Sequence, residues 1–159
     1  MKNRFSTLPF PSYTHIPGLT PHPEKEGGHH FNQQELKEEK IFNSDEENCF
    51  SETFCYGIDL LNHEFFWESH VLFEICWNQE GRKGEKSDFL KGLIKLGACG
   101  VKLKMKEEKL ALEHFHRGRD LFSSITKTPH IKEISSQLVV DLSSLAIFHN
   151  HSLFIHLNI

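Results

Sequence analysis

Hydrophobic residues recur at helical spacing through most of the chain. In the segment 47–62, the apolar residues of one helix face are Phe50, Phe54, Ile58 and Leu61. The segment 64–78 is apolar nearly all round, which indicates a central helix. The same periodicity predicts three further helices, at 88–105, 107–124 and 129–147. The pattern therefore predicts an all-α bundle of four to five helices arranged in helical hairpins.

Polar residues mark the expected helix starts. Ser44 or Asp45 is a candidate N-cap for the first helix and Ser87 for the third, because their side-chain oxygens can accept a free helical N–H. A charged loop at 81–84 separates the second helix from the third. The polar segment 32–48 fits a short exposed helix followed by a loop.

Small residues are concentrated in the third predicted helix. They are Gly92, Gly97, Ala98, Cys99 and Gly100. A glycine inside a helix costs roughly 1 kcal/mol relative to alanine, so we expect a neighbouring helix or chain segment to approach closely here. The glycine-rich helix 88–105 is also the predicted contact of a homo-oligomer.

Equal spacing of matched residues hints at an internal repeat. The interval from Gly57 to Gly100 equals that from Leu60 to Leu103. Such a period is typical of helical hairpins of the tetratricopeptide kind.

The beginning of the chain has a different composition. Five of the six prolines lie there, at Pro9, Pro11, Pro17, Pro21 and Pro23. Proline excludes a helix and keeps this arm extended, but large apolar residues accompany it, so we expect the arm to pack along the helices. The chain divides into an arm and polar linker (1–46), a helical domain (47–147) and a C-terminal tail (148–159).

Composition limits the function. The net charge is −4 and the pI is near 6.3, which argues against nucleic-acid binding driven by bulk charge. No apolar run is long enough to span a membrane, and the N-terminus lacks the apolar core of a signal peptide. The cysteines, which have no Cys-x-x-Cys spacing, are Cys49, Cys55, Cys76 and Cys99. We expect reduced thiols in a cytoplasmic protein.

Four stretches carry a family resemblance. They read Gly-Ile-Asp-Leu-Leu-Asn-His (57–63), Phe-Trp-Glu-Ser-His (66–70), Glu-Ile-Cys-Trp (74–77) and Asp-Phe-Leu-Lys-Gly-Leu-Ile-Lys-Leu (88–96). With them the segment from Phe54 to Phe122 resembles the bacterial family called domain of unknown function 309. The resemblance implies a small all-helical domain whose biochemistry is unassigned.

The arm adds to this resemblance, and one position departs from it. Residues 13–23, followed by Gly28 and His29, look like the N-terminal extension of the longer members. Family members often read Trp-Glu-Ala-His-Glu after the second helix begins, whereas this chain has Val71 in place of the second acid. This weakens a catalytic role based on adjacent His and Glu.

His70 and Glu74 form the leading candidate site. They are four residues apart, so they share one helix face, within a predicted apolar stripe that includes Trp77. A buried imidazole and carboxylate need partners, so the pair is either structural or functional. In the functional case it binds a metal or acts as an acid–base couple. Glu68 points to the opposite side, where we expect it to cap or pair with the first hairpin.

The arm offers further ligands. If it crosses the second helix, His22 and His29 complete a metal set with His70 and Glu74; otherwise they hold the arm by hydrogen bonds. A divalent metal is not the favoured cofactor, because two ligands on one helix are too few for zinc.

Aromatic and charged residues complete the binding candidates. Trp67 and Trp77 either pack in the core or wall an aromatic pocket. Lys91, which shares a helix face near Asp88 with Lys95 and Lys102, belongs either to an anion-binding stripe or to a solvated face.

The leading hypothesis is a cytoplasmic binding or scaffold module with a small polar pocket around His70 and Glu74. Its partner would be a protein or a small molecule, with no role for nucleic acid or membrane. The alternative is a metal-dependent or acid–base enzyme, hydrolase-like, acting on a small molecule.

Overall fold

The computed structural model describes residues 4–30, 36–43, 49–144, 157 and 159. Its helices are α1 (Glu52–Asn62), α2 (Phe66–Gln79), α3 (Glu85–Lys104), α4 (Glu108–Ser123) and α5 (Pro129–Ser144). The only β-pairing among the described residues is an isolated antiparallel bridge between Phe42 and Phe50. The predicted all-α class is confirmed.

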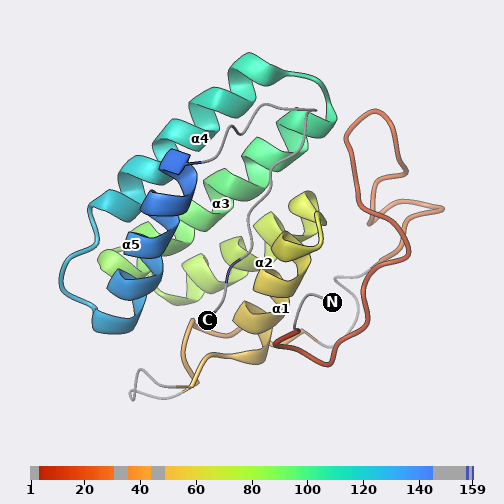
Figure 1. Ribbon diagram of the computed structural model, residues 1–159. Helices are drawn as coiled ribbons and strands as arrows, with labels where there is room; N and C mark the ends of the chain where they lie inside the picture. Colours follow the sequence, from red (N-terminus) through yellow and green to blue (C-terminus); the bar gives the residue numbers. More distant parts are fainter. Residues whose placement is uncertain (1–3, 31–35, 44–48, 145–156, 158) are drawn as a thin grey trace.

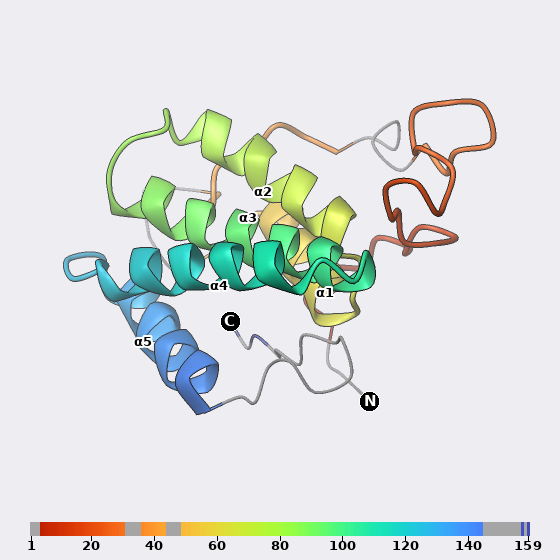
Figure 2. The ribbon, with the colours of Figure 1, turned by 90° about the horizontal axis from the view of Figure 1, so that it is seen from above.

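Each helix packs against the next one in the chain. α2, α3 and α4 lie side by side with α3 in the middle, α1 packs on α2, and α5 packs on α4 (Figures 1 and 2). The described part of the arm runs along the side of the bundle formed by α1 and α2 (Figure 1). No helix in the described ranges is long and apolar enough to cross a membrane.

A series of aromatic contacts joins the first four helices. The Phe54 ring of α1 lies 6.0 Å from Phe73 of α2 and 6.2 Å from Phe89 of α3. Phe89 lies 5.9 Å from Phe122 of α4. All four rings are buried, and aromatic pairs at such distances add to the free energy gained from apolar burial.

The first helix starts later than predicted. α1 begins at Glu52 rather than near residue 47, and its N-cap is Ser51, whose Oγ accepts an N–H of the first turn. The Ser51 N–H donates to the Ile41 carbonyl at 2.8 Å, so the linker is attached at the start of α1. Ser44 and Asp45, the predicted caps, lie outside the described residues.

The third helix starts earlier than predicted. Gly84, with a φ of 83°, precedes Glu85, so Ser87 is buried within the first turn and is not the N-cap. The Glu85 carboxylate accepts the N–H groups of residues 126–128 at 2.7–3.0 Å, just before α5 begins. These backbone hydrogen bonds lower the pKa of Glu85 to about 2.

The polar linker is tied to the first two helices. Residues 36–43 are not helical, so the short helix predicted within 32–48 is absent from its described part. Thr53 donates to the Lys37 carbonyl at 2.8 Å, and the Ile41 N–H donates to Glu80 at 3.0 Å.

The end of the chain returns to α1. The Leu157 N–H and carbonyl both bond to the Asn62 side chain, at 2.8 and 2.9 Å, and Leu157 is buried. The predicted tail 148–159 otherwise lies almost entirely outside the described residues.

The glycines of α3 are covered by neighbouring helices, as the small-residue pattern predicts. A Cβ at Gly97 would meet the backbone of Phe66 and the Cβ of His70 on α2, and one at Gly100 would overlap the Phe66 ring. A Cβ at Gly92 would overlap the Phe122 ring of α4. These glycines are buried within one copy of the chain, and the predicted oligomer contact through helix 88–105 stays a prediction.

We expect Gly100→Ala to destabilise the protein by about 1–3 kcal/mol, because the new methyl group overlaps a buried ring. In an unobstructed helix the same change stabilises by roughly 1 kcal/mol. Urea unfolding measures the difference, and Phe66→Leu in the same chain should recover part of the loss. Stabilisation by the single change would contradict this packing.

Candidate functional site

A buried carboxylate of α1 binds the start of the arm. The Asp59 side chain is fully buried, and its oxygens accept the N–H groups of Phe5 and Ser6, each at 2.9 Å. The Arg4 guanidinium lies 3.5 Å away. Because a buried carboxylate needs hydrogen-bond donors, this site ties the arm to α1.

A second buried carboxylate binds the arm further along. Glu68 of α2 is fully buried and accepts the His15 N–H at 2.7 Å and a ring N–H of His29 at 2.8 Å. The Thr14 hydroxyl donates at 3.3 Å. Glu68 therefore binds the arm, and the predicted pairing with the first hairpin was wrong.

The arm makes further contacts between these two points. The Tyr56 hydroxyl donates to the Pro9 carbonyl at 2.6 Å, and burial raises the pKa of Tyr56 to about 12. His15 and His22 place their rings against Trp67, at 5.0 and 5.7 Å. The prediction that the arm packs along the helices is confirmed, and His29 fastens it by a hydrogen bond.

His70 and Glu74 lie at the surface. His70 Nε2 is 3.4 Å from Glu74 Oε1, and the side chains are 26% and 49% exposed. The prediction that an apolar stripe buries both side chains was wrong, because the buried residues of α2 include Phe66, Leu72 and Phe73, and His70 and Glu74 are not among them. The hydrogen bond to His70, with the nearby Arg82 and Lys95 cations, lowers the pKa of Glu74.

The predicted metal set is not brought together. His29 bonds to Glu68, the His22 ring lies against Trp67, and His70 pairs with Glu74. Among the described residues, no group of three or more His, Cys, Asp and Glu side chains could hold a metal ion.

Two cations lie over the ring of Trp77, the other tryptophan predicted as a binding residue. The Arg82 guanidinium lies 4.8 Å from the Trp77 ring centre, and the Lys91 ammonium 5.9 Å. Lys91 thus contacts Trp77, while Lys95 is the α3 lysine that acts on Glu74. Asp88 is partly buried in the first turn of α3.

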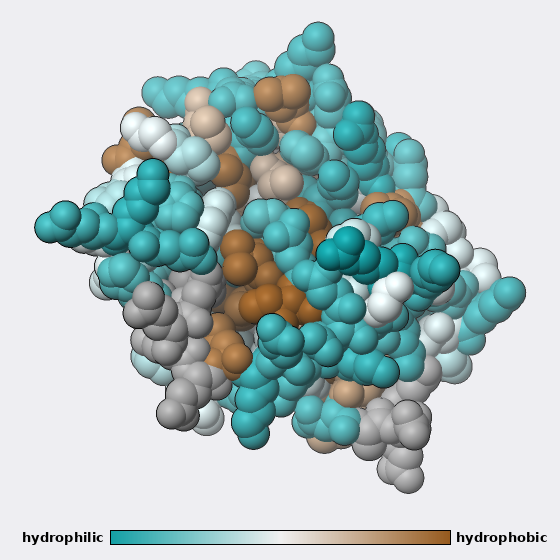
Figure 3. Space-filling model, turned by 180° about the vertical axis from the view of Figure 1, so that it is seen from behind, coloured by the Kyte–Doolittle hydropathy of each residue, from teal (hydrophilic) through white to brown (hydrophobic). Residues whose placement is uncertain are grey.

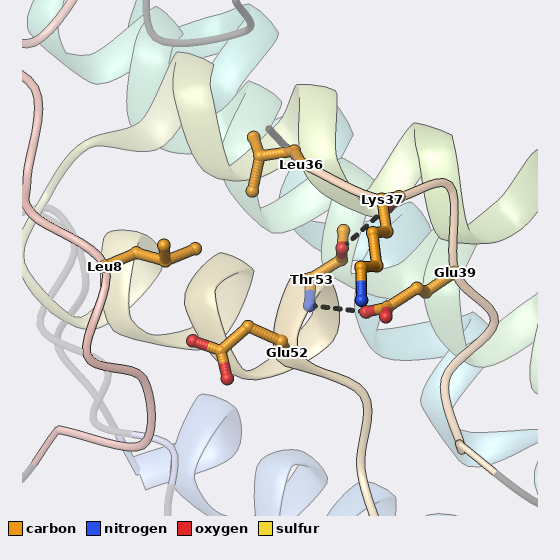
Figure 4. Close-up of a pocket in the computed structure, with 6 residues that line it drawn as sticks. All are labelled: Leu8, Leu36, Lys37, Glu39, Glu52 and Thr53. Carbon is orange, nitrogen blue, oxygen red and sulfur yellow. Dashed lines mark hydrogen bonds between the residues drawn. The ribbon is translucent and has the colours of Figure 1, made fainter. Parts of the chain in front are cut away.

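Two pockets lie elsewhere. A cavity of about 110 Å³ is lined by Leu8, Leu36, Lys37, Glu39, Glu52 and Thr53 (Figure 4). Ser6 donates to Glu52 and the Thr53 N–H donates to Glu39, so its carboxylates serve to attach the arm and linker. This volume is below that of an ordinary small-molecule site.

The second pocket is larger and does not include any residue predicted as a site. Its volume is about 360 Å³. It is lined by Phe50, His130, Glu133, Ile134, Gln137 and Ile159.

The outer side of α1 and α2 also carries a small apolar cluster. Tyr56, Leu60 and Leu72 are its buried members. Partly buried residues around them include Leu36, Val71 and Ile75. Figure 3 shows hydrophobic side chains gathered in a hollow at the centre of the face seen from behind.

The helices that carry these residues match a known protein family. The model of the family described as Domain of unknown function (DUF309) matches residues 54–114. Segment 54–114 resembles DUF309. The match runs from α1 into α4, so it confirms the predicted resemblance there and leaves that of the arm a prediction. No curated protein and no solved structure matches the chain.

Sequence reasoning missed the main role of Asp59. One signal was available, since Asp59 interrupts the apolar run Gly-Ile-Asp-Leu-Leu, and a carboxylate there needs donors from elsewhere. The backbone N–H groups that satisfy it carry no sequence signature, so the partner segment could not be named.

The two carboxylates of α2 should differ strongly in their effect on stability. We expect Glu68→Gln to cost about 3 kcal/mol or more, because it removes a buried charge that binds donors of the arm. Glu74→Gln should cost less than about 1 kcal/mol, because its pair is exposed. Urea unfolding of both variants tests this, and equal losses would contradict the assignment.

We expect protonation of His15 to lower the stability of the folded chain in mild acid. Burial and the neighbouring His22 lower the pKa of His15, while Glu68 acts in the opposite direction. As the pH is lowered from about 7 to about 5, His15 is protonated more readily in the unfolded chain than in the folded chain. The free energy of unfolding therefore decreases as the pH decreases. His15→Asn should reduce this slope. The exposed His130→Asn is the control, and an unchanged slope in His15→Asn would refute the idea.

Proposed function

We propose that this chain is a binding or scaffold module that acts through the exposed surface around His70, Glu74 and Trp77. The observation that carries the proposal is the contrast between the two α2 carboxylates. Glu68 is buried and its oxygens are used by the arm, whereas Glu74 is half-exposed beside His70. One side of α2 is thus committed to stability and the other is accessible to a partner.

Contacts with the arm, the linker and α3 hold α2, which carries this surface, in a fixed position. The arm and linker are hydrogen-bonded to α1 and α2, and the glycines of α3 let α2 approach closely. A surface held on packed helices loses little conformational entropy when it binds. Trp77, with cations on its ring, is the residue type that most often dominates interface energetics.

The alternative acid–base role receives less support from this geometry. A general base works best with a pKa near the operating pH. The pKa of Glu74 is lowered instead, which makes its carboxylate a weaker base and favours a permanently ionised contact.

The proposal includes a cytoplasmic location and a protein or small-molecule partner. All four cysteines are free, and burial raises the pKa of Cys76 and of Cys99 to about 12. Free cysteines, with Cys76 and Cys99 held as unreactive buried thiols, suit a reducing compartment.

Affinity capture with the full chain tests the proposal. We expect a stoichiometric partner to bind about tenfold more weakly to Trp77→Leu, which keeps apolar volume but removes the indole. Val140→Ser, on an exposed position of α5, should bind as wild type does. Thermal melts check that both variants fold.

A different result would identify the protein as an enzyme. If Trp77→Leu retains every partner, while Glu74→Gln abolishes turnover of a small molecule and leaves the fold intact, the protein is an enzyme and the proposal fails.

A further inference from the structure

A row of lysines lies along α3 between its two neighbouring helices. Lys91, Lys95 and Lys102 are spaced to share one helix face. Lys91 reaches the Trp77 ring on α2, and Lys95 packs beside Gly118 of α4. α3 is the middle helix of the α2–α3–α4 layer (Figure 2), and these contacts place Lys91 and Lys95 between α3 and its two neighbours.

Lys95 lies between side chains of both outer helices. Its charge acts on Glu74 of α2 and on His114 of α4. Burial and the Lys95, Arg117 and Lys102 cations lower the pKa of His114. Positive charge therefore accumulates across the face although the whole chain has a net charge of −4.

This charge is only partly neutralised within the chain. Lys102 pairs with Glu107 at 2.9 Å, and Glu74 pairs with His70. Across the described part of the chain, Lys91, Lys95 and Arg117 have no carboxylate within 4.0 Å. Trp77 Nε1 on α2 and His114 Nδ1 on α4 are buried, and neither has a hydrogen-bond partner among the described residues.

We propose that this lysine row, flanked by Trp77 and His114, binds an acidic peptide segment of a protein partner. The inference rests on the proposed function and specifies the ligand of the same surface. Carboxylates of the segment would pair with Lys91 and Lys95, neither of which has a carboxylate within 4.0 Å among the described residues, while apolar groups contact the Trp77 ring. Charge complementarity of this kind selects partners and raises the rate of encounter.

The shape of the surface favours a peptide over a single small anion. Lys91 to Lys102 span about 16 Å of helix at 1.5 Å per residue, which matches about five residues of extended chain. Neither of the two pockets described above is lined by these lysines. A long, open row suits several carboxylates in sequence, whereas one phosphate would contact only part of it.

Fluorescence anisotropy of the full chain with labelled hexaglutamate tests the proposal. We expect saturable binding that weakens as salt is raised. The double change Lys91→Glu and Lys95→Glu should weaken binding at least about tenfold. The matched control is Lys127→Glu with Lys132→Glu, which changes net charge equally at exposed positions before and on α5 and should leave binding within about twofold.

Three results would overturn the proposal. They are the absence of hexaglutamate binding, an equal loss in the control variant, and tighter binding of hexathymidylate or of inorganic phosphate than of hexaglutamate. If a captured partner still depends on Trp77 while hexaglutamate does not bind, the proposed function stands and only this assignment of the ligand fails.

Discussion

The structure depends on satisfying two carboxylates that the helices bury. Asp59 and Glu68 have no access to water, and a buried charge without donors costs several kcal/mol. Their donors are N–H groups of the arm together with His29. The arm is therefore part of the folded domain, and the backbone N–H groups of Phe5, Ser6 and His15 donate to the carboxylates of α1 and α2.

Close helix packing provides the second constraint. Glycines of α3 lie against Phe66 on one side and against Phe122 on the other, so α3 can be the middle helix of a layer. Their low helix propensity is offset by contacts that a larger residue would prevent. The matched segment 54–114 includes most of this layer, so the resemblance to DUF309 concerns the helices more directly than the arm.

These two constraints leave one face of the layer for interaction. Glu68, Asp59 and the glycines are used inside the molecule, whereas Glu74 and Lys91 are exposed and Trp77 is partly buried beside them. Stability and proposed function thus use opposite sides of α2. A partner can bind the exposed side without disturbing the buried hydrogen bonds that hold the arm.

The sequence by itself determined the helical class, the approximate helix positions and the packing role of the glycines, and it led us to expect that the arm packs along the helices. Apolar periodicity and proline content are local properties, and local properties suffice for such features. Only the tertiary structure decided which carboxylate is buried. The apolar pattern of α2 predicted that Glu74 is buried, but the structure buries Glu68 beneath the arm and leaves Glu74 half-exposed. Burial and pairing depend on segments distant in the chain, and those contacts separated the structural carboxylate from the accessible one.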